Sequence, residues 1–332
     1  MGVKSPALAT RLSRPYPAPM SKRIAFLFSG QGAQTVGMGK DLAARFPAVA
    51  ALFQQADEVL GRAFTSVVFE GPEADLVKTA NCQPALYVHG LACLAALRAE
   101  IGDIFPPHAA AGLSLGEFTA HAAAGTFTFA NGLRLVAERG RLMQLACEST
   151  TGAMAAMIGG EEDAIRTLAA ECDVDVANFN SHGQIVLSGE AAKIDAAVEG
   201  AKDKGVRKAT RLNVAGAYHS RLMQTAADAL APVLAATPMQ PPSFPILANV
   251  IARPVHEPAE IRAKLAAQVT GSVRWTETIE HLVDVEKIDL FLELGPGGIL
   301  AGLVRRIRKD TPVLSVSDGA TLDAALLQLR AI

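Results

Sequence analysis

The sequence predicts an α/β protein: a large domain with a mainly parallel sheet, and a small α+β domain inserted into it. Short apolar runs alternate with helical patterns before position 150 and after position 214, which is typical of a parallel sheet covered by helices. Between these positions the predicted order is β-α-β-β-α-β, the ferredoxin-like pattern. The 332 residues, of which 50% are hydrophobic, are enough to form both cores.

The large domain is predicted to comprise residues 20–150 and 214–332. Its first strand, Ile24 to Phe28, is a continuous apolar run that ends at the glycine-rich segment SGQGAQ. A weaker strand over 109–112 leads into the segment LSLGE. Further strands are predicted over 245–249, 290–293 and 313–317, and helices over 39–46, 48–60, 83–101, 131–148, 220–236 and 261–268.

The small domain is predicted over residues 151–213, and a separate extension precedes the large domain. The strands of the small domain are predicted over 153–158, 174–178, 184–188 and 209–214, and its helices over 161–171 and 191–204. Residues 1–19 contain Pro15, Pro17 and Pro19 and no acidic residue. This composition predicts a disordered extension, and a transit peptide is the alternative.

The overall composition argues against several classes of protein. The 31 basic and 33 acidic residues give a net charge of -2, so the basic excess typical of nucleic-acid binding is missing. No apolar stretch reaches the roughly 18 residues of a membrane-spanning helix. The four cysteines form no C-x-x-C pair, which is typical of a reduced, cytoplasmic protein. We expect neither a metal site nor a bound cofactor.

The segment Gly112 to Gly116 fits the pattern G-x-S-x-G. Its glycines allow a strand to turn sharply into a helix, so that the side chain of Ser114 is exposed at the tip of the turn. The helix N-terminus favours negative charge there, and the backbone N–H of Leu115 can donate to a developing oxyanion. Since so short a pattern also arises by chance, a helix-capping serine is the alternative.

A serine nucleophile needs a base, and the downstream histidines supply the candidates. His219, in the segment GAYHS, follows the strand predicted over 209–214, and α/β sites assemble where strands end at a crevice. His121 lies about two helical turns after Ser114 and is expected to point away. His182 lies in an Asn/Gly-rich loop of the predicted small domain, and we interpret His256 and His281 as ordinary surface or loop residues.

Two other segments carry groups that could complete such a site. The loop SGQGAQ lacks the P-loop and Rossmann spacings, but it can direct one backbone N–H toward Ser114. The helical segment ERGRLMQ carries Arg139 and Arg141, which lie two residues apart and therefore face nearly opposite sides. At most one of them can reach the site, where a buried guanidinium is a natural bidentate partner for a carboxylate.

Taken together, these segments resemble the malonyl-CoA:acyl carrier protein transacylase family. The resemblance extends from Met20 to about Leu329. Seven blocks occur in the order found in the family: FLFSGQGAQTVGMG, GLSLGEFTAHAAAG, RGRLMQ, NFNSHGQIVLSG, GAYHS, SVRWTETI and ELGPGGIL. The family implies a large α/β-hydrolase-like domain with a ferredoxin-like insert. It also implies transfer of malonyl from coenzyme A to a carrier protein for fatty acid biosynthesis.

The resemblance implies catalytic roles for three residues. Ser114 is expected to be the acylated nucleophile and His219 its base. Gln268, seven residues before Trp275, is expected to orient His219 through its backbone carbonyl, in place of the acidic residue of a usual triad.

Four more residues are expected at the site from the same resemblance. The backbone N–H groups of Gln31 and Leu115 form the oxyanion hole, and Arg139 binds the malonyl carboxylate. Tyr218 matches the bulky aromatic residue of malonyl-selective members, whose ring should crowd a methyl branch on the substrate.

The sequence departs from the family pattern in two places. Leu113 stands where the family usually has histidine before the nucleophile, and a change in rate or acyl preference is the expected consequence. Gly271 and Ser272 stand where members often carry Asn-Pro or Ser-Pro, which puts the rigidity of the loop after Gln268 in question.

We expect the protein to bind malonyl-CoA and an acyl carrier protein, and to bind neither nucleic acid nor a membrane. We also expect it to be a monomer in the cytoplasm. Within the class, the alternatives are a discrete polyketide-type acyltransferase and the acyltransferase subunit of a malonate decarboxylase. A serine esterase of the α/β-hydrolase class would share G-x-S-x-G but would normally carry its histidine near the C-terminus. A binding module without catalytic activity would leave the serine, histidine and arginine segments unexplained.

Overall fold

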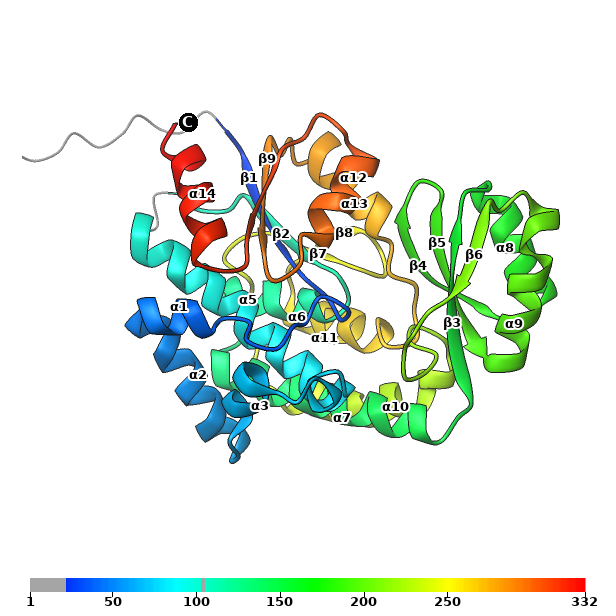
Figure 1. The fold of residues 1–332 in the computed structure, drawn as a ribbon, viewed down its shortest axis with the longest axis horizontal. Helices are drawn as coiled ribbons and strands as arrows, with labels where there is room; N and C mark the ends of the chain where they lie inside the picture. Colours follow the sequence, from blue (N-terminus) through cyan, green and yellow to red (C-terminus); the bar gives the residue numbers. More distant parts are fainter. Residues whose placement is uncertain (1–21, 103–104, 332) are drawn as a thin grey trace, which may run out of the picture.

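The structure is a computed structural model that describes residues 22–102 and 105–331, so the extension predicted over 1–19 lies outside the described residues. Two sheets dominate it (Figure 1). The larger has the strand order β10-β9-β1-β2-β7-β8, and its neighbours are parallel except for β7 and β8. Its strands are β1 (Ile24–Phe28), β2 (Ala109–Gly112), β7 (Ile246–Ala248), β8 (Arg253–Val255), β9 (Leu290–Leu294) and β10 (Val313–Val316). The predicted α/β fold with a mainly parallel sheet is therefore confirmed.

Strand β1 lies at the centre of this sheet, and all five of its residues are buried. Ile24, Phe26 and Phe28 pack into the core on one face, whereas Ala25 and Leu27 pack into the core on the other. A strand buried on both faces reads as a continuous apolar run rather than an alternating one, which is why the segment IAFLF was recognisable.

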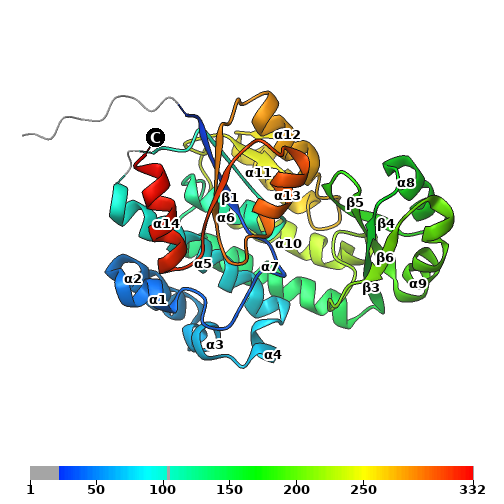
Figure 2. The ribbon, with the colours of Figure 1, turned by 45° about the horizontal axis from the view of Figure 1, so that its top comes forward.

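Helices cover both faces of the large sheet (Figures 1 and 2). Helices α12 (Trp275–Asp284) and α13 (Ile299–Ile307) form one core with the sheet. The opposite core is formed by α1 (Lys40–Arg45), α2 (Pro47–Leu60), α3 (Phe64–Glu70), α4 (Glu73–Leu76), α5 (Thr79–Ile101), α6 (Leu115–Ala123), α7 (Phe129–Glu148), α10 (Gln224–Ala236), α11 (Pro258–Ala267) and α14 (Gly319–Leu329). None of the described helices is long and apolar enough to pass through a bilayer.

The smaller sheet is antiparallel, with the strand order β4-β5-β3-β6. Its core is shared with helices α8 (Glu162–Glu171) and α9 (Ala191–Gly200), which lie on its outer side in Figure 1. The strands are β3 (Gly152–Ile158), β4 (Asp175–Ser181), β5 (Gln184–Glu190) and β6 (Lys208–Arg211). The helix predicted over 191–204 ends at Gly200 and continues as a 3₁₀ turn, and the strand predicted to reach 214 ends at Arg211.

Strand β4 bonds the small sheet to two segments outside it. The Phe179 N–H donates to the Val273 carbonyl at 2.9 Å, and the Val273 N–H donates to the Ala177 carbonyl at 2.8 Å. At the start of the same strand, the Asp175 carboxylate accepts hydrogen bonds from the backbone N–H of Arg221 and from its Nη2, both at 2.8 Å. The small sheet is thus bonded to the loop that follows α11 and to the segment that precedes α10.

Sequence analysis missed the short helices α3 and α4, the three-residue strand β8 and the C-terminal helix α14. Elements of one or two turns give too few apolar positions for a periodic pattern to be recognised. A signal was present for α14: the side chains of Asp318 and Thr321 form a capping box at its first turn.

Replacing Gly116 by alanine should destabilise the fold, because the added Cβ would lie 2.1 Å from the Phe28 carbonyl oxygen of the central strand. We expect Gly116→Ala to lower the free energy of unfolding by about 1–3 kcal/mol, as overpacking of a close-packed core does. Gly302→Ala is the matched control, because Gly302 lies in α13 and a Cβ there would meet no atom within 4 Å. Urea unfolding should show equal or higher stability for that control.

Candidate active site

The turn between β2 and α6 holds Ser114 in an unusual backbone conformation, with φ 53° and ψ -105°. The flanking glycines allow the strand and helix to approach closely: a Cβ on Gly112 would lie 1.9 Å from the carbonyl carbon of Gly116. Positive φ in a residue other than glycine costs free energy, so such a conformation persists only where the surroundings fix it. The sharp turn expected from G-x-S-x-G is present.

Asn249, directly after β7, fixes this turn from the neighbouring strand. Its Oδ1 accepts a hydrogen bond from the Ser114 N–H at 2.7 Å, and its Nδ2 donates to the Gly112 carbonyl at 2.8 Å. The residue is fully buried, so these bonds satisfy polar groups that would otherwise be costly to bury. Sequence analysis did not identify Asn249, although a polar residue at the end of a buried strand was the available signal.

Ser114, His219 and Gln268 form a hydrogen-bonded series. The distance from Ser114 Oγ to His219 Nε2 is 2.8 Å, and the distance from His219 Nδ1 to the Gln268 carbonyl oxygen is also 2.8 Å. Because a carbonyl can only accept, Nδ1 must carry the proton, and Nε2 is left free to accept the serine proton. The loop after Gln268 is itself held, since the Ser272 hydroxyl donates to the Val176 carbonyl at 2.6 Å.

The pKa of His219 is lowered from its ordinary value to about 4, first by burial and then by the nearby positive charge of Arg139. The imidazole is therefore neutral at physiological pH and available as a base. β6, the strand before His219, lies at the edge of the small antiparallel sheet and ends at Arg211, earlier than predicted. His219 reaches the crevice through an irregular segment, where its own φ is 54°.

Arg139 on α7 is buried beside the serine, with 1% of its surface exposed. Its Nη2 donates to Ser114 Oγ at 3.1 Å and to Gln268 Oε1 at 2.9 Å, and its Nη1 donates to Gln83 Oε1 at 2.6 Å. Burial lowers its pKa to about 10, so the guanidinium stays charged near neutral pH. Arg141 points outward and pairs with Glu138, as expected for residues two apart on a helix.

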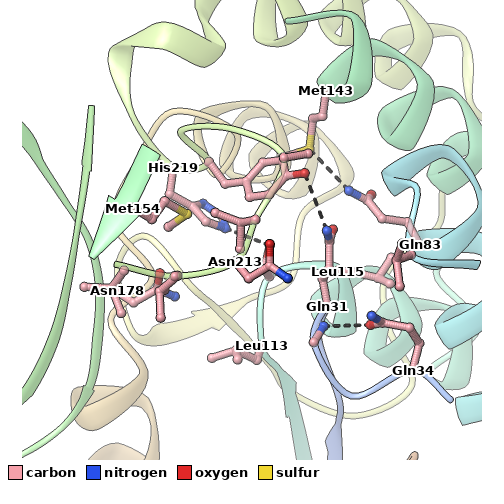
Figure 3. Close-up of a pocket in the computed structure, with 18 of the residues that line it drawn as sticks. Gln31, Gln34, Gln83, Leu113, Leu115, Met143, Met154, Asn178, Asn213 and His219 are labelled. Carbon is pink, nitrogen blue, oxygen red and sulfur yellow. Dashed lines mark hydrogen bonds between the residues drawn. The ribbon is translucent and has the colours of Figure 1, made fainter. Parts of the chain in front are cut away.

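A cavity of about 660 Å³, with Ser114 among its lining residues, separates the helices beside the large sheet from the small sheet. Figure 3 shows this cavity. Six of the seven residues expected at the site line it: Gln31, Ser114, Leu115, Arg139, Tyr218 and His219. The seventh, Gln268, lies behind His219 and is fully buried. Figure 3 shows Met154 and Asn178 of the small sheet on the side of the cavity opposite Gln83.

Both residues of the expected oxyanion hole, Gln31 and Leu115, line the cavity. Leu115 is the first residue of α6, where backbone N–H groups have no acceptor within the helix. The Tyr218 hydroxyl lies 2.5 Å from Thr79 Oγ1, and it accepts a longer hydrogen bond of 3.5 Å from the side-chain Nε2 of Gln31. Leu113, which replaces the histidine usual in the family, also lines the cavity.

The remaining histidines do not contact Ser114. His121 is buried and bonds Thr126, so it points away from the serine as expected. His182 and His256 are exposed. His281 was expected at the surface but is buried within α12, where Arg253 contacts its Nδ1 at 3.0 Å. Among residues 22–102 and 105–331, no group of three or more His, Cys, Asp or Glu side chains is arranged to hold a metal ion.

The acyl transferase domain family matches residues 25–321 of the sequence. This chain belongs to that family. The match covers the turn at Ser114, the helix of Arg139 and the segments of His219 and Gln268, so all the expected residues lie within the family's domain.

Several acyltransferases are similar to this chain over nearly their full length. Malonyl CoA-acyl carrier protein transacylase of Bacillus subtilis is 40% identical over 316 residues, which cover 94% of this chain and 98% of that protein. The crystal structure of acyl-carrier-protein-S-malonyltransferase from Bartonella henselae is 39% identical, with a TM-score of 0.88, and covers 93% of this chain and 99% of that one. A second structure, of a type II polyketide synthase acyl carrier protein in complex with its malonyl-transacylase, contains a chain that is 38% identical to this one. The TM-score is 0.88, and the match covers 92% of this chain and 99% of that one.

The acid limit of catalysis by this acyltransferase should lie well below the ordinary pKa of histidine. Because the His219 pKa is lowered to about 4 from 6.5, the neutral base form persists as the pH falls until about 4. At saturating acyl-CoA, the single-turnover rate of acylation should keep its value down to about pH 5. A rate that declines through pH 6.5, while circular dichroism shows an intact fold, would contradict this expectation.

Proposed function

We propose that this acyltransferase moves a malonyl group from coenzyme A to the phosphopantetheine thiol of an acyl carrier protein, and that it serves fatty acid biosynthesis. The observation that carries the proposal is the contact of Ser114 Oγ with both a neutral imidazole and a buried guanidinium. The first activates a nucleophile, and the second gives the site a fixed positive charge that suits an acyl group bearing a carboxylate. The names of the similar transacylases support the same substrate and acceptor.

In the first half-reaction, Ser114 Oγ attacks the thioester carbonyl carbon of malonyl-CoA while His219 Nε2 takes the hydroxyl proton. The oxygen of the tetrahedral intermediate accepts hydrogen bonds from the backbone N–H groups of Gln31 and Leu115. The C–S bond then breaks, His219 returns the proton to the departing thiolate, and a malonyl ester remains on the serine. The Gln268 carbonyl stabilises the imidazolium that forms between these proton transfers.

The second half-reaction reverses these roles with a different thiol. The carrier's phosphopantetheine sulfur attacks the ester carbonyl as His219 takes its proton, and the same two N–H groups stabilise the oxyanion. The bond to Ser114 Oγ breaks, and His219 returns the proton to the serine. Every proton and electron pair is accounted for by the chain and its two substrates, so the proposed reaction requires no cofactor.

Arg139 is proposed to bind the free carboxylate of the malonyl group and to direct it away from the reacting carbonyl. A guanidinium offers two parallel donors, which match a carboxylate better than the point charge of a lysine. Tyr218, fixed by Thr79, is proposed to limit branching at the malonyl carbon, because its ring occupies the cavity wall near His219.

The domain division expected from the sequence fits this proposal. Residues 151–213 are assigned to a ferredoxin-like small domain, which the strand order β4-β5-β3-β6 and the two helices on one face support. Residues 20–150 and 214–332 are assigned to an α/β-hydrolase-like large domain. In this arrangement the cavity lies between the domains, with the nucleophile on the larger one.

The proposed partner is an acyl carrier protein, and the protein is proposed to act as a cytoplasmic monomer without nucleic acid or membrane. A related role in polyketide synthesis is the second candidate. It is favoured by the similarity to the malonyl-transacylase that was solved with a type II polyketide synthase carrier.

Replacing the nucleophile should abolish both the covalent intermediate and the transfer. After brief exposure to malonyl-CoA, intact-protein mass spectrometry should show one malonyl adduct on the wild-type protein, located on Ser114 by peptide mapping, and none on Ser114→Ala. His219→Ala should slow acylation by about 10²–10⁴-fold. Wild-type turnover by the serine variant would overturn the proposal.

Removing Arg139 should change the choice of acyl group rather than abolish acyl transfer. Arg139→Ala should lower malonyl transfer by roughly a hundredfold or more, because an unpaired buried carboxylate costs about 2–5 kcal/mol. Acetyl transfer, which involves no such carboxylate, should be spared or raised. Arg141→Ala is the matched control, because Arg141 is exposed on the opposite side of the same helix. Equal losses of malonyl and acetyl transfer would show that Arg139 supports the fold instead.

A further inference from the structure

One buried ionisable group beside the site has no role in the mechanism above. Glu117 lies on α6, one turn after Ser114, and 1% of its surface is exposed. Its Oε2 accepts hydrogen bonds from Gln268 Nε2 at 2.6 Å and from the Asn249 N–H at 2.9 Å. Its Oε1 is buried without a partner in the described part of the chain. A fully buried carboxyl group is costly to keep, so its contacts merit a physical explanation.

The side chain of Gln268 joins this carboxyl group to Arg139. Gln268 Nε2 donates to Glu117, while its Oε1 accepts from Arg139 Nη2 at 2.9 Å. A single neutral amide therefore separates a buried guanidinium from a buried carboxyl group. Both are shielded from water, so their charges interact more strongly than they would in solvent.

We propose that Glu117 is the counter-ion of Arg139, linked to it through the Gln268 side chain, and that its charge sets how tightly Arg139 binds the malonyl carboxylate. This inference rests on the function proposed above. Glu117 does not reach the reacting atoms, and it acts on specificity through Gln268 and Arg139.

The net charge of the buried site depends on whether Glu117 is protonated. With Glu117 ionised, the pair Arg139 and Glu117 is neutral, and an incoming malonyl carboxylate brings one uncompensated negative charge. With Glu117 protonated, the same carboxylate neutralises Arg139. Binding of the malonyl group should therefore favour the protonated form of Glu117 and be accompanied by uptake of a proton.

The proton affinity of Glu117 suits such an exchange near neutral pH. Burial raises its pKa to about 7, against the lowering effects of its hydrogen bonds and of Arg139. The other histidines and tyrosines that pack around α6 and the site keep pKa values far from neutrality, in each case because burial disfavours the charged form. These groups are His121 on α6, Tyr87 and His89 on α5, and Tyr218 and His219 in the segment before α10. Glu117 is thus the member of this group that titrates near pH 7.

Calorimetry on the full chain tests the proton uptake directly. The Ser114→Ala variant should bind acyl-CoA without reacting. Acyl-CoA is titrated into this variant at pH 7 in buffers of different ionisation enthalpy, and the dependence of the binding enthalpy on the buffer gives the number of protons taken up. We expect malonyl-CoA to bind with more proton uptake than acetyl-CoA, which has the same coenzyme but no carboxylate. The difference should vanish in the double variant Ser114→Ala/Glu117→Gln, because the amide cannot titrate. Equal uptake for the two ligands on Ser114→Ala would overturn the inference, even if the double variant failed to fold.

Steady-state kinetics give a second test. Ionised Glu117 repels the malonyl carboxylate but has no effect on an acetyl group. The kcat/KM for malonyl-CoA, divided by that for acetyl-CoA, should therefore fall by about tenfold from about pH 6 to about pH 8.5. A tenfold fall is what results if the bound malonyl carboxylate raises the pKa of Glu117 by about one unit. The fall should arise in KM and should be absent in Glu117→Gln. Glu293→Gln is the matched control, because Glu293 is a buried glutamate of β9 bonded to Ser315 and to the first turn of α13.

The outcomes separate this inference from the proposed function. If wild-type protein forms no malonyl adduct on Ser114, the function itself is wrong. If the adduct forms, two results would overturn only the role of Glu117. One is a ratio of malonyl to acetyl kcat/KM that does not change with pH in the wild type, and the other is an equal change of that ratio in Glu117→Gln.

Discussion

The site depends on one buried amide. Gln268 positions His219 with its backbone carbonyl, accepts from Arg139 with its side-chain oxygen, and donates to Glu117 and to the Ser114 carbonyl with its side-chain nitrogen. A carboxylate at this position could accept but not donate, and an ammonium could donate but not accept. An amide does both without adding charge, so a cation and a carboxyl group can share one small buried volume.

Strain is concentrated where the chemistry is proposed to occur. Ser114 and His219 both have positive φ, a conformation that costs roughly 1–3 kcal/mol in a residue other than glycine. Each lies in a segment held by buried hydrogen bonds, from Asn249 to the serine turn and from Gln268 to the imidazole. The surrounding structure therefore fixes the two side chains toward one another before any substrate arrives, and little reorganisation is required for reaction.

The sequence was informative where function depends on local geometry. The turn at Ser114 follows from glycines two residues away on each side, and the separation of Arg139 from Arg141 follows from helix periodicity. Asn249 and Glu117 were missed because their roles depend on bonds between segments more than 130 positions apart, which no local pattern records. The location of His219 was expected correctly, although the strand before it ends at Arg211 and an irregular segment carries the histidine to Ser114.

The bonds of β4 to Val273 and to Arg221 limit how the two sheets can move. Both anchors lie within five residues of a catalytic segment, one after Gln268 and the other after His219. A rotation of the small sheet that broke these bonds would displace the base as well as the cavity wall. The edge along β4 is therefore where the small sheet is fixed, whereas two other residues that line the cavity, Val77 and Val214, are exposed to solvent.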